Sequence, residues 1–218
     1  MLCYSCKNER SIPQILDLAI PHDSTLNLIP EGLIDFNTSQ WLEITPENSG
    51  ITMDIRYATT NNFTEAQIYD CGRCFLRPEM ARKIVLLNQE IKDKYGLSFK
   101  LFDCYRPKPS QEKLWFMMPD PNYVTPPEKG SMHNRGLAVD ITLIYEDGEE
   151  LDMGTEYDFF GVEAHTDNMD LPEHVLKNRE LLKNMVEEIG LSGIRTEWWH
   201  FSYSGMEASI SDWVWNCP

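Results

Sequence analysis

The sequence has few of the features that membrane-spanning and nucleic-acid-binding proteins need. No apolar run in its 218 residues approaches the ~18 residues that a membrane-spanning helix requires. Only 19 lysines and arginines stand against 35 aspartates and glutamates, which gives a formal net charge of −16. Such an acidic surface repels phosphate backbones and anionic lipid headgroups. We therefore expect no nucleic-acid partner and no membrane span.

Cysteine is also scarce. Six cysteines are too few for a scaffold in which disulfides replace the core, although their even number permits up to three bridges. The pairs Cys3-x-x-Cys6 and Cys71-x-x-Cys74 have the local spacing of a structural zinc site, but they lie much further apart than the two pairs of a zinc ribbon. A cysteine zinc site and disulfides both stay open as alternatives.

A recognisable secretory signal is missing as well. Residues 1–10 contain no basic stretch followed by the apolar segment that a signal peptide needs. The expected location is the cytoplasm, or the periplasm if a signal was removed upstream of this sequence.

Two helices are indicated by apolar residues at helical spacing. One is expected to begin at Pro78 and to end at Gly96, and the other covers residues 172–189. A third, shorter helix is expected to be capped by Ser110 and to end near Met118.

Strands are indicated by alternation of apolar and polar residues over 98–102, 136–143 and 196–203. Helices and strands occur in mixed order, without regular βαβ alternation, so the expected fold is a single α+β domain with a central antiparallel sheet flanked by helices. Apolar residues in 1–50 do not recur at a helical or strand spacing. We therefore expect this segment to be an extended lead-in that packs on the globular unit of residues 51–218.

The first pattern with chemical meaning centres on Asp140. This aspartate shares one face of the predicted strand with two small residues, Ala138 and Thr142. A carboxylate in the middle of a strand is costly unless it is paired or binds a metal ion. His133 lies seven residues earlier and can face the same centre if Gly136 lets the chain turn sharply. Histidine and aspartate are both good zinc ligands.

The second pattern is Glu197-Trp-Trp-His200. Positions i and i+3 of a regular strand face opposite sides, so the two side chains converge only if Glu197 lies at a bend at the start of the strand. Three protein ligands leave the fourth zinc position for water, whose pKa the metal lowers towards ~7, and a nearby glutamate can take its proton. Each of these residues, taken singly, is more often structural than catalytic. Together they favour metal-assisted hydrolysis of an amide.

These two patterns resemble the zinc peptidases that cleave D-alanyl-D-alanine, which share a fold with lysostaphin-type endopeptidases and the hedgehog signalling domain. The resemblance spans about residues 54–203. Three further stretches narrow it to the VanX-like D-alanyl-D-alanine dipeptidases, namely residues 56–63, 103–107 and 153–159.

The resemblance implies that His133, Asp140 and His200 hold one catalytic Zn²⁺ and that Glu197 is the general base. Arg106 matches the arginine that supports the developing oxyanion, a role that suits a permanently charged guanidinium. The alternative for Arg106 is a surface salt bridge.

The resemblance also implies a pocket for a small dipeptide. Tyr57 and Asp158 match residues that hold the ammonium group of the substrate, and Ser131 matches one that meets its carboxylate. A longer peptide would leave one of these buried groups unpaired. Met132 stands where close relatives often have a serine, which could change the C-terminal subsite.

The implied function is that of a bacterial cell-wall metalloprotease, a dipeptidase that hydrolyses D-alanyl-D-alanine to free D-alanine. One alternative is a D,D- or L,D-carboxypeptidase that acts on longer peptidoglycan peptides, and another is a non-hydrolytic binding module that contains zinc. Turnover of wall fragments and resistance to glycopeptide antibiotics would use the same chemistry.

Overall fold

A computed structural model describes residues 40–218 of the chain. Its helices and strands follow in the order β1 (Leu42–Ile44), α1 (Pro46–Ser49), β2 (Thr52–Met53), β3 (Cys74–Leu76), α2 (Pro78–Tyr95), β4 (Leu97–Asp103), α3 (Lys108–Met117), β5 (Ala138–Tyr145), α4 (Glu173–Glu188), β6 (Leu191–Ile194) and β7 (Glu197–Tyr203), with 3-10 turns at Arg56–Ala58, His133–Arg135 and Val162–Ala164. Within residues 40–218, none of the helices is long and apolar enough to cross a membrane.

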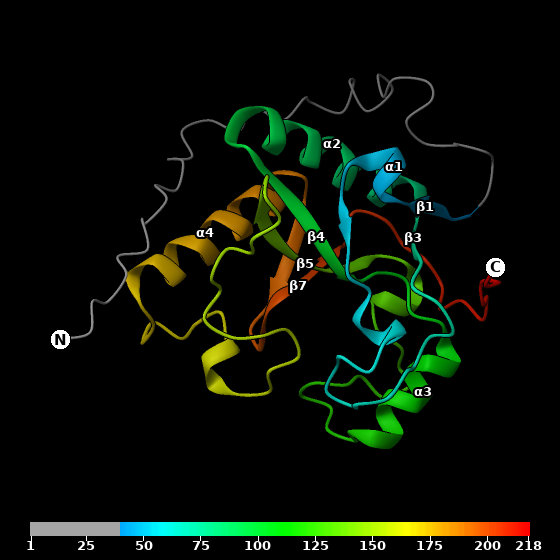
Figure 1. Cartoon of the computed structure of the whole chain (residues 1–218). Coiled ribbons are helices and arrows are strands. Elements are labelled where there is room, and N and C mark those ends of the chain that lie inside the picture. Colours follow the sequence, from blue (N-terminus) through cyan, green and yellow to red (C-terminus); the bar gives the residue numbers. More distant parts are fainter. Residues whose placement is uncertain (1–39) are drawn as a thin grey trace.

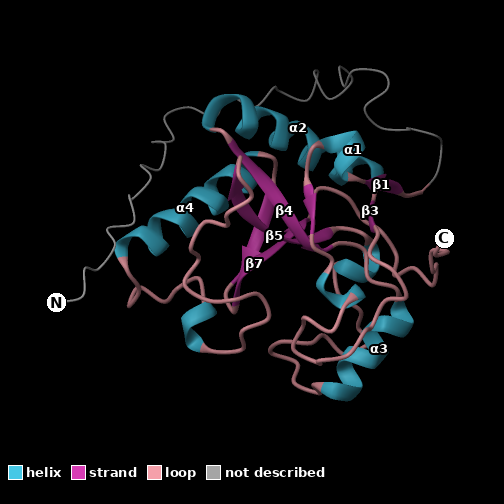
Figure 2. Cartoon of the chain, in the orientation of Figure 1, coloured by secondary structure: helices cyan, strands magenta, loops and turns pink. Residues whose placement is uncertain are grey.

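The core of the fold is a five-stranded sheet with the order β2-β4-β5-β7-β6, and β1 and β3 form a separate antiparallel pair. The pairs β4–β5, β5–β7 and β7–β6 are antiparallel, whereas the two-residue β2 runs parallel to β4. The predicted α+β fold with a central antiparallel sheet is therefore confirmed, with one parallel edge strand added. Figure 2 shows these strands at the centre of the molecule, surrounded by helices and long loops.

Helix α2 follows the sequence prediction closely. Its apolar positions Met80, Ile84 and Leu87 are fully buried, which stabilises the fold by roughly 1.5–3 kcal/mol for each side chain. The helix ends because Gly96 adopts φ +62° and donates its backbone N–H to the carbonyl of Lys92. Figure 1 shows α2 and α4 beside the central strands and α3 at the opposite side of the molecule.

The predicted cap of the short helix is wrong. Helix α3 begins at Lys108, with Pro107 as its N-cap, and Ser110 lies inside its first turn, where its backbone N–H donates to the carbonyl of Pro107. Pro109 explains the earlier start, because a proline fits the first turn of a helix, where a backbone N–H has no intrahelical partner.

The lead-in is described only from residue 40. Leu42 and Ile44 of β1 are buried in the same hydrophobic core as the central sheet, and Trp41 stacks on Trp213 of the C-terminal tail. Residues 1–39 lie outside the described part of the chain, so the boundary at residue 50 stays a prediction.

Two disulfides join distant parts of the described chain. Cys71 is bonded to Cys217, and Cys74 to Cys104. Cys71 and Cys74 therefore do not form the zinc site that their spacing permits. Cys3 and Cys6 lie outside the described residues.

The backbone of Gly136 lies too close to Trp41 to leave room for a side chain. Its φ is +70°, and an added Cβ would lie 2.2 Å from the Trp41 ring. Gly148 has φ +86° with nothing within 4 Å, so it is a matched control. The left-handed backbone costs about 1–2 kcal/mol for an alanine at either site. We expect Gly136→Ala to lower the free energy of unfolding, measured with urea, by clearly more than Gly148→Ala does. Equal losses would contradict the close approach of Trp41.

Candidate metal centre and active site

Three adjacent strands place polar side chains in one row. Asp103 of β4 pairs with Asp140 of β5, and Asp140 pairs with His200 of β7. The register of β4 shifts between Leu101 and Asp103. Without this bulge Phe102 would face Asp140, so the extra residue brings the carboxyl of Asp103 into the row.

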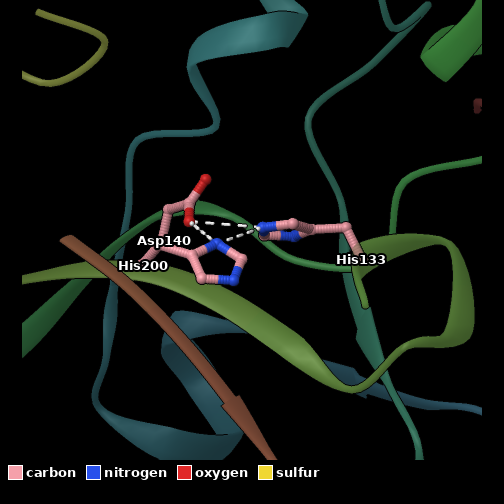
Figure 3. Close-up of side chains that lie close together, drawn as sticks. All are labelled: His133, Asp140 and His200. Atoms are coloured by element: carbon pink, nitrogen blue, oxygen red, sulfur yellow. Dashed lines mark hydrogen bonds and ion pairs between the residues drawn. The ribbon is translucent and has the colours of Figure 1, made fainter. Parts of the chain in front are cut away.

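His133 reaches the row from the 3-10 turn that precedes β5. Gly136 ends this turn in the left-handed conformation, and its backbone N–H donates to the carbonyl of His133. The sharp turn expected at Gly136 is therefore present. Figure 3 shows His133, Asp140 and His200 pointing towards one another.

The distances between the three side chains fit a metal ion. His133 Nε2 lies 3.0 Å from His200 Nδ1 and 3.2 Å from Asp140 Oδ1, and His200 Nδ1 lies 3.1 Å from that same oxygen. Ligand atoms with bonds of roughly 2.0–2.1 Å to a tetrahedral ion lie roughly 3.3 Å apart. The three atoms could therefore hold one ion between them.

Two contacts behind the triad fix how its side chains present these atoms. His133 Nδ1 lies 2.6 Å from the carbonyl oxygen of Cys104. A carbonyl only accepts, so Nδ1 carries the proton and Nε2 is left free to bind a metal ion. Tyr157 donates its hydroxyl proton to Asp140 Oδ2 over 3.0 Å, which leaves Oδ1 for the ion.

Sequence reasoning did not identify either supporting group. Tyr157 lies inside the stretch 153–159 that carries the resemblance, so its place beside Asp158 was a usable signal. The group on Cys104 is a backbone carbonyl. Every residue has one, so the sequence gives no sign of its role.

The electrostatics of the triad suit a cation. Burial alone would raise the pKa of Asp140, but His133 and His200 hold it well below its usual range. Burial raises the pKa of Tyr157 well above its usual value, and the charge of Asp140 adds to this effect, so the phenol stays protonated and keeps donating. Asp103, Asp158 and Glu197 add three more carboxyls around this centre, against the single guanidinium of Arg106. A divalent cation would offset this excess of negative charge.

Glu197 lies where the sequence required a bend. In the β6–β7 pairing, Gly193 faces Phe201 whereas the next residue, Ile194, faces Glu197. This irregularity bulges β7 between Glu197 and His200, so the two side chains need not face opposite sides of the strand. Burial raises the pKa of Glu197 to about 8, with added repulsion from Asp140. A carboxyl with such a pKa can exchange a proton near neutral pH.

Arg106 is buried, so the alternative of a surface salt bridge is wrong. Its Nε and Nη2 donate to Asp103 Oδ2 over 3.1 and 2.8 Å, and its Nη1 donates to Gln111 Oε1 over 3.0 Å. Tyr69 donates to the other oxygen of Asp103 over 2.7 Å. These bonds use three of the five guanidinium N–H groups, which leaves donors for another oxygen.

Two of the three residues expected to bind substrate lie together. Tyr57 donates to Asp158 Oδ1 over 3.2 Å, and Asp158 Oδ2 is buried without a hydrogen-bond partner among the described residues. The ring of Tyr57 packs under the guanidinium of Arg106, with 5.1 Å between Cζ and the ring centroid. Ser131 lies two residues before the turn that carries His133, and its hydroxyl donates to Asn134 Oδ1.

Comparisons with known proteins agree with this geometry. The model of the peptidase M15 family, described as D-ala-D-ala dipeptidase, matches residues 39–215. The D-alanyl-D-alanine dipeptidase of Escherichia coli K12 is 34% identical over 76% of this chain and 85% of its own length. The D-alanyl-D-alanine dipeptidases of Enterococcus faecium and Enterococcus faecalis are 30% and 29% identical, each over 70% of this chain and 85% of its own length.

The raised pKa of Glu197 predicts how stability depends on pH. The folded state of the metal-free protein binds a proton that the unfolded state releases between its ordinary pKa near 4.5 and the folded value of about 8. The free energy of unfolding should therefore fall as pH rises through this window, by at most about 1.4 kcal/mol per pH unit from this group. The side chain of Glu197→Gln does not titrate, so the variant lacks this pH-dependent contribution to the free energy of unfolding. We expect urea unfolding to show a gap between the variant and wild type that widens, in favour of the variant, as pH rises. A constant gap would contradict the shift.

Tyr157→Phe tests the support of Asp140. The variant keeps the ring but loses the hydrogen bond to Oδ2, so the carboxylate is less well oriented. We expect affinity for Zn²⁺, measured by competition with a chromophoric chelator, to fall about 10-fold or more, as is usual for such supporting groups. Tyr203→Phe is the control, because its hydroxyl donates to Glu79 and has no described contact with a triad residue. The idea fails if both variants bind Zn²⁺ alike.

Proposed function

Because the chain belongs to the D-ala-D-ala dipeptidase family of peptidases, we propose that it hydrolyses the dipeptide D-alanyl-D-alanine to two molecules of D-alanine. The family and its hydrolytic class confirm the resemblance found in the sequence motifs. The observation that carries the proposal is the buried centre in which three ligand atoms converge with Glu197 and Arg106 beside them.

In this proposal His133, Asp140 and His200 hold one Zn²⁺, which two imidazole nitrogens and one carboxylate oxygen suit. When bound there, the ion supplies a Lewis acid and makes its water acidic. Glu197 accepts the proton of the attacking water and returns it to the departing amine. Burial raises the pKa of Glu197 to about 8 in the metal-free protein. A divalent cation bound at the triad would favour the carboxylate form, which is the form that accepts the proton.

Arg106 is proposed to stabilise the oxyanion that develops on the substrate carbonyl. Its three hydrogen bonds to Asp103 and Gln111 fix the guanidinium before substrate arrives, so little reorganisation is needed during the reaction. Asp103 neutralises part of its charge but leaves N–H groups free to donate.

Asp158 and Tyr57 are proposed to bind the substrate ammonium. Burial, together with the nearby Asp140, raises the pKa of Asp158 well above its usual range, and its Oδ2 lacks a partner among the described residues. A substrate ammonium would supply both the missing donor and the compensating charge. Ser131 is proposed to meet the substrate carboxylate. Groups at both ends would select dipeptides, because a longer chain would leave one of them unpaired.

The two alternatives are weaker. A binding module without hydrolysis would not need a buried arginine and a buried glutamate at the same centre. A carboxypeptidase would need room for a longer peptide where Asp158 presents its unpaired oxygen. The relatives are bacterial, and the two disulfides favour an oxidising compartment such as the periplasm over the cytoplasm.

The test is release of D-alanine from D-alanyl-D-alanine by Zn²⁺-loaded protein. L-alanyl-L-alanine, a pentapeptide that ends in D-alanyl-D-alanine, and a chelator-treated sample are run beside it. We expect chelator-sensitive cleavage of the D,D-dipeptide alone. Glu197→Gln should keep bound Zn²⁺ and lose about 10²–10⁴-fold in rate, because it cannot accept a proton.

Each other outcome points elsewhere. Cleavage of the pentapeptide would favour a carboxypeptidase, and bound Zn²⁺ without any cleavage would favour a binding module. An active Glu197→Gln variant would remove Glu197 from the role of base.

A further inference from the structure

We propose that the Cys74–Cys104 disulfide is a positioning element of the metal centre, so that its loss weakens metal binding beyond any loss of folding stability. The inference rests on the proposed function, in which His133 is a metal ligand. It concerns a bond that lies behind the site and touches neither metal nor substrate.

Cys104 connects the disulfide directly to the ligand. Its side chain is buried and bonded to Cys74, while its own carbonyl oxygen accepts a hydrogen bond from His133 Nδ1–H at 2.6 Å. The orientation of the imidazole therefore depends on a carbonyl that belongs to a residue with a covalent anchor. Supporting groups that hold a ligand histidine commonly change metal affinity 10–100-fold.

The disulfide also joins the two sheets at this point. Cys74 lies in β3, which pairs with β1 and not with the central sheet, whereas Cys104 directly follows β4 of that sheet. Beside the disulfide, Tyr105 donates its backbone N–H to the carbonyl of Phe75 over 2.9 Å. The disulfide and this hydrogen bond together attach the start of the segment 104–106 to β3.

The same segment holds His133 from a second side. Arg106 donates its backbone N–H to the carbonyl of His133 over 3.1 Å, while the His133 ring donates to Cys104. A shift of the segment would therefore move the ligand histidine and the buried arginine together. The disulfide restrains both groups.

The second disulfide provides a matched comparison. Cys71 and Cys217 are 146 residues apart in sequence, against 30 for Cys74 and Cys104. In the chain-entropy account, the longer loop gives the larger effect on unfolding. Cys217 belongs to the C-terminal tail, which hydrogen-bonds Asn134, Arg135 and the hydroxyl of Tyr105. The tail makes no described hydrogen bond to His133, to Cys104 or to the backbone of segment 104–106. The two disulfides should therefore affect stability and metal affinity in opposite order.

The experiment compares Cys74→Ala/Cys104→Ala with Cys71→Ala/Cys217→Ala in the full chain. The Kd for Zn²⁺ is measured by competition with a chromophoric chelator, the visible spectrum of the Co²⁺-loaded protein reports ligand geometry, and the Tm is measured without metal. We expect loss of Cys74–Cys104 to raise the Kd about 10-fold and to alter the Co²⁺ spectrum. Loss of Cys71–Cys217 should lower the Tm more and change the Kd less than twofold, because neither of its cysteines makes a described hydrogen bond to a triad residue.

A further arm breaks the Cys74–Cys104 bond without substituting either cysteine, so that any change in Kd cannot come from the alanine side chains. In Cys71→Ala/Cys217→Ala protein, a water-soluble phosphine reduces Cys74–Cys104. The two sulfurs take up two electrons and two protons, and the phosphine takes oxygen from water to become its oxide. The Kd should then rise as in the double variant.

The outcomes distinguish a failure of the positioning role from a failure of metal binding at the triad. An unchanged Kd after loss of Cys74–Cys104, or equal rises for both disulfides, would overturn the positioning role. Wild-type protein that binds no Zn²⁺ at the triad would instead overturn the proposed function.

Discussion

The register between β4, β5 and β7 is the constraint on which the site depends. It sets Asp103, Asp140 and His200 side by side across three strands. Side chains alternate along a strand, so a slip of one residue in either pairing would turn one member of the row to the other face of the sheet. The bulge in β4 is part of the same constraint, because it aligns Asp103 with Asp140 instead of Phe102. The site is thus built mainly by strand pairing, with loops adding His133 and Asp158.

This arrangement concentrates charge that the fold must neutralise. Arg106 offsets the charge of Asp103 through two hydrogen bonds, and His133 and His200 stabilise the charge of Asp140. Neither Glu197 nor Asp158 forms an ion pair within residues 40–218, and burial raises the pKa of each carboxyl more than the nearby cations lower it. Both groups are therefore held in environments that an uncharged form tolerates better than an ionised one. A cation at the triad and an ammonium beside Asp158 would relieve this cost, which links the stability of the site to the ligands it is proposed to bind.

The sequence predicted those parts of the fold and site that side chains encode. The period of α2, the strand around Asp140 and the turn at Gly136 all follow from residue type and spacing, and the structure has each of them. It could not predict the carbonyl of Cys104 or the register that brings Asp103 to Asp140, because both depend on backbone placement and on pairing between distant segments. The partners of Cys71 and Cys74 were open for the same reason, since spacing alone fits a zinc pair as well as two disulfides.

The two sides of the centre are held in different ways, and this difference fits a hydrolase that must admit and release a small molecule. Behind His133, hydrogen bonds, a disulfide and the packing of Tyr105 on Trp41 fix the segment 104–106. The groups proposed to act on the peptide bond of the substrate therefore stay in place. On the other side, Asp158 adopts φ +60°, in the left-handed region, and keeps one oxygen without a partner among the described residues. A non-glycine residue held in this conformation carries strain that the surrounding structure must offset. The groups proposed to act in catalysis are therefore already held in place, whereas Asp158 keeps an oxygen without a partner among the described residues. This is the arrangement expected if the ammonium of the proposed substrate supplies that partner.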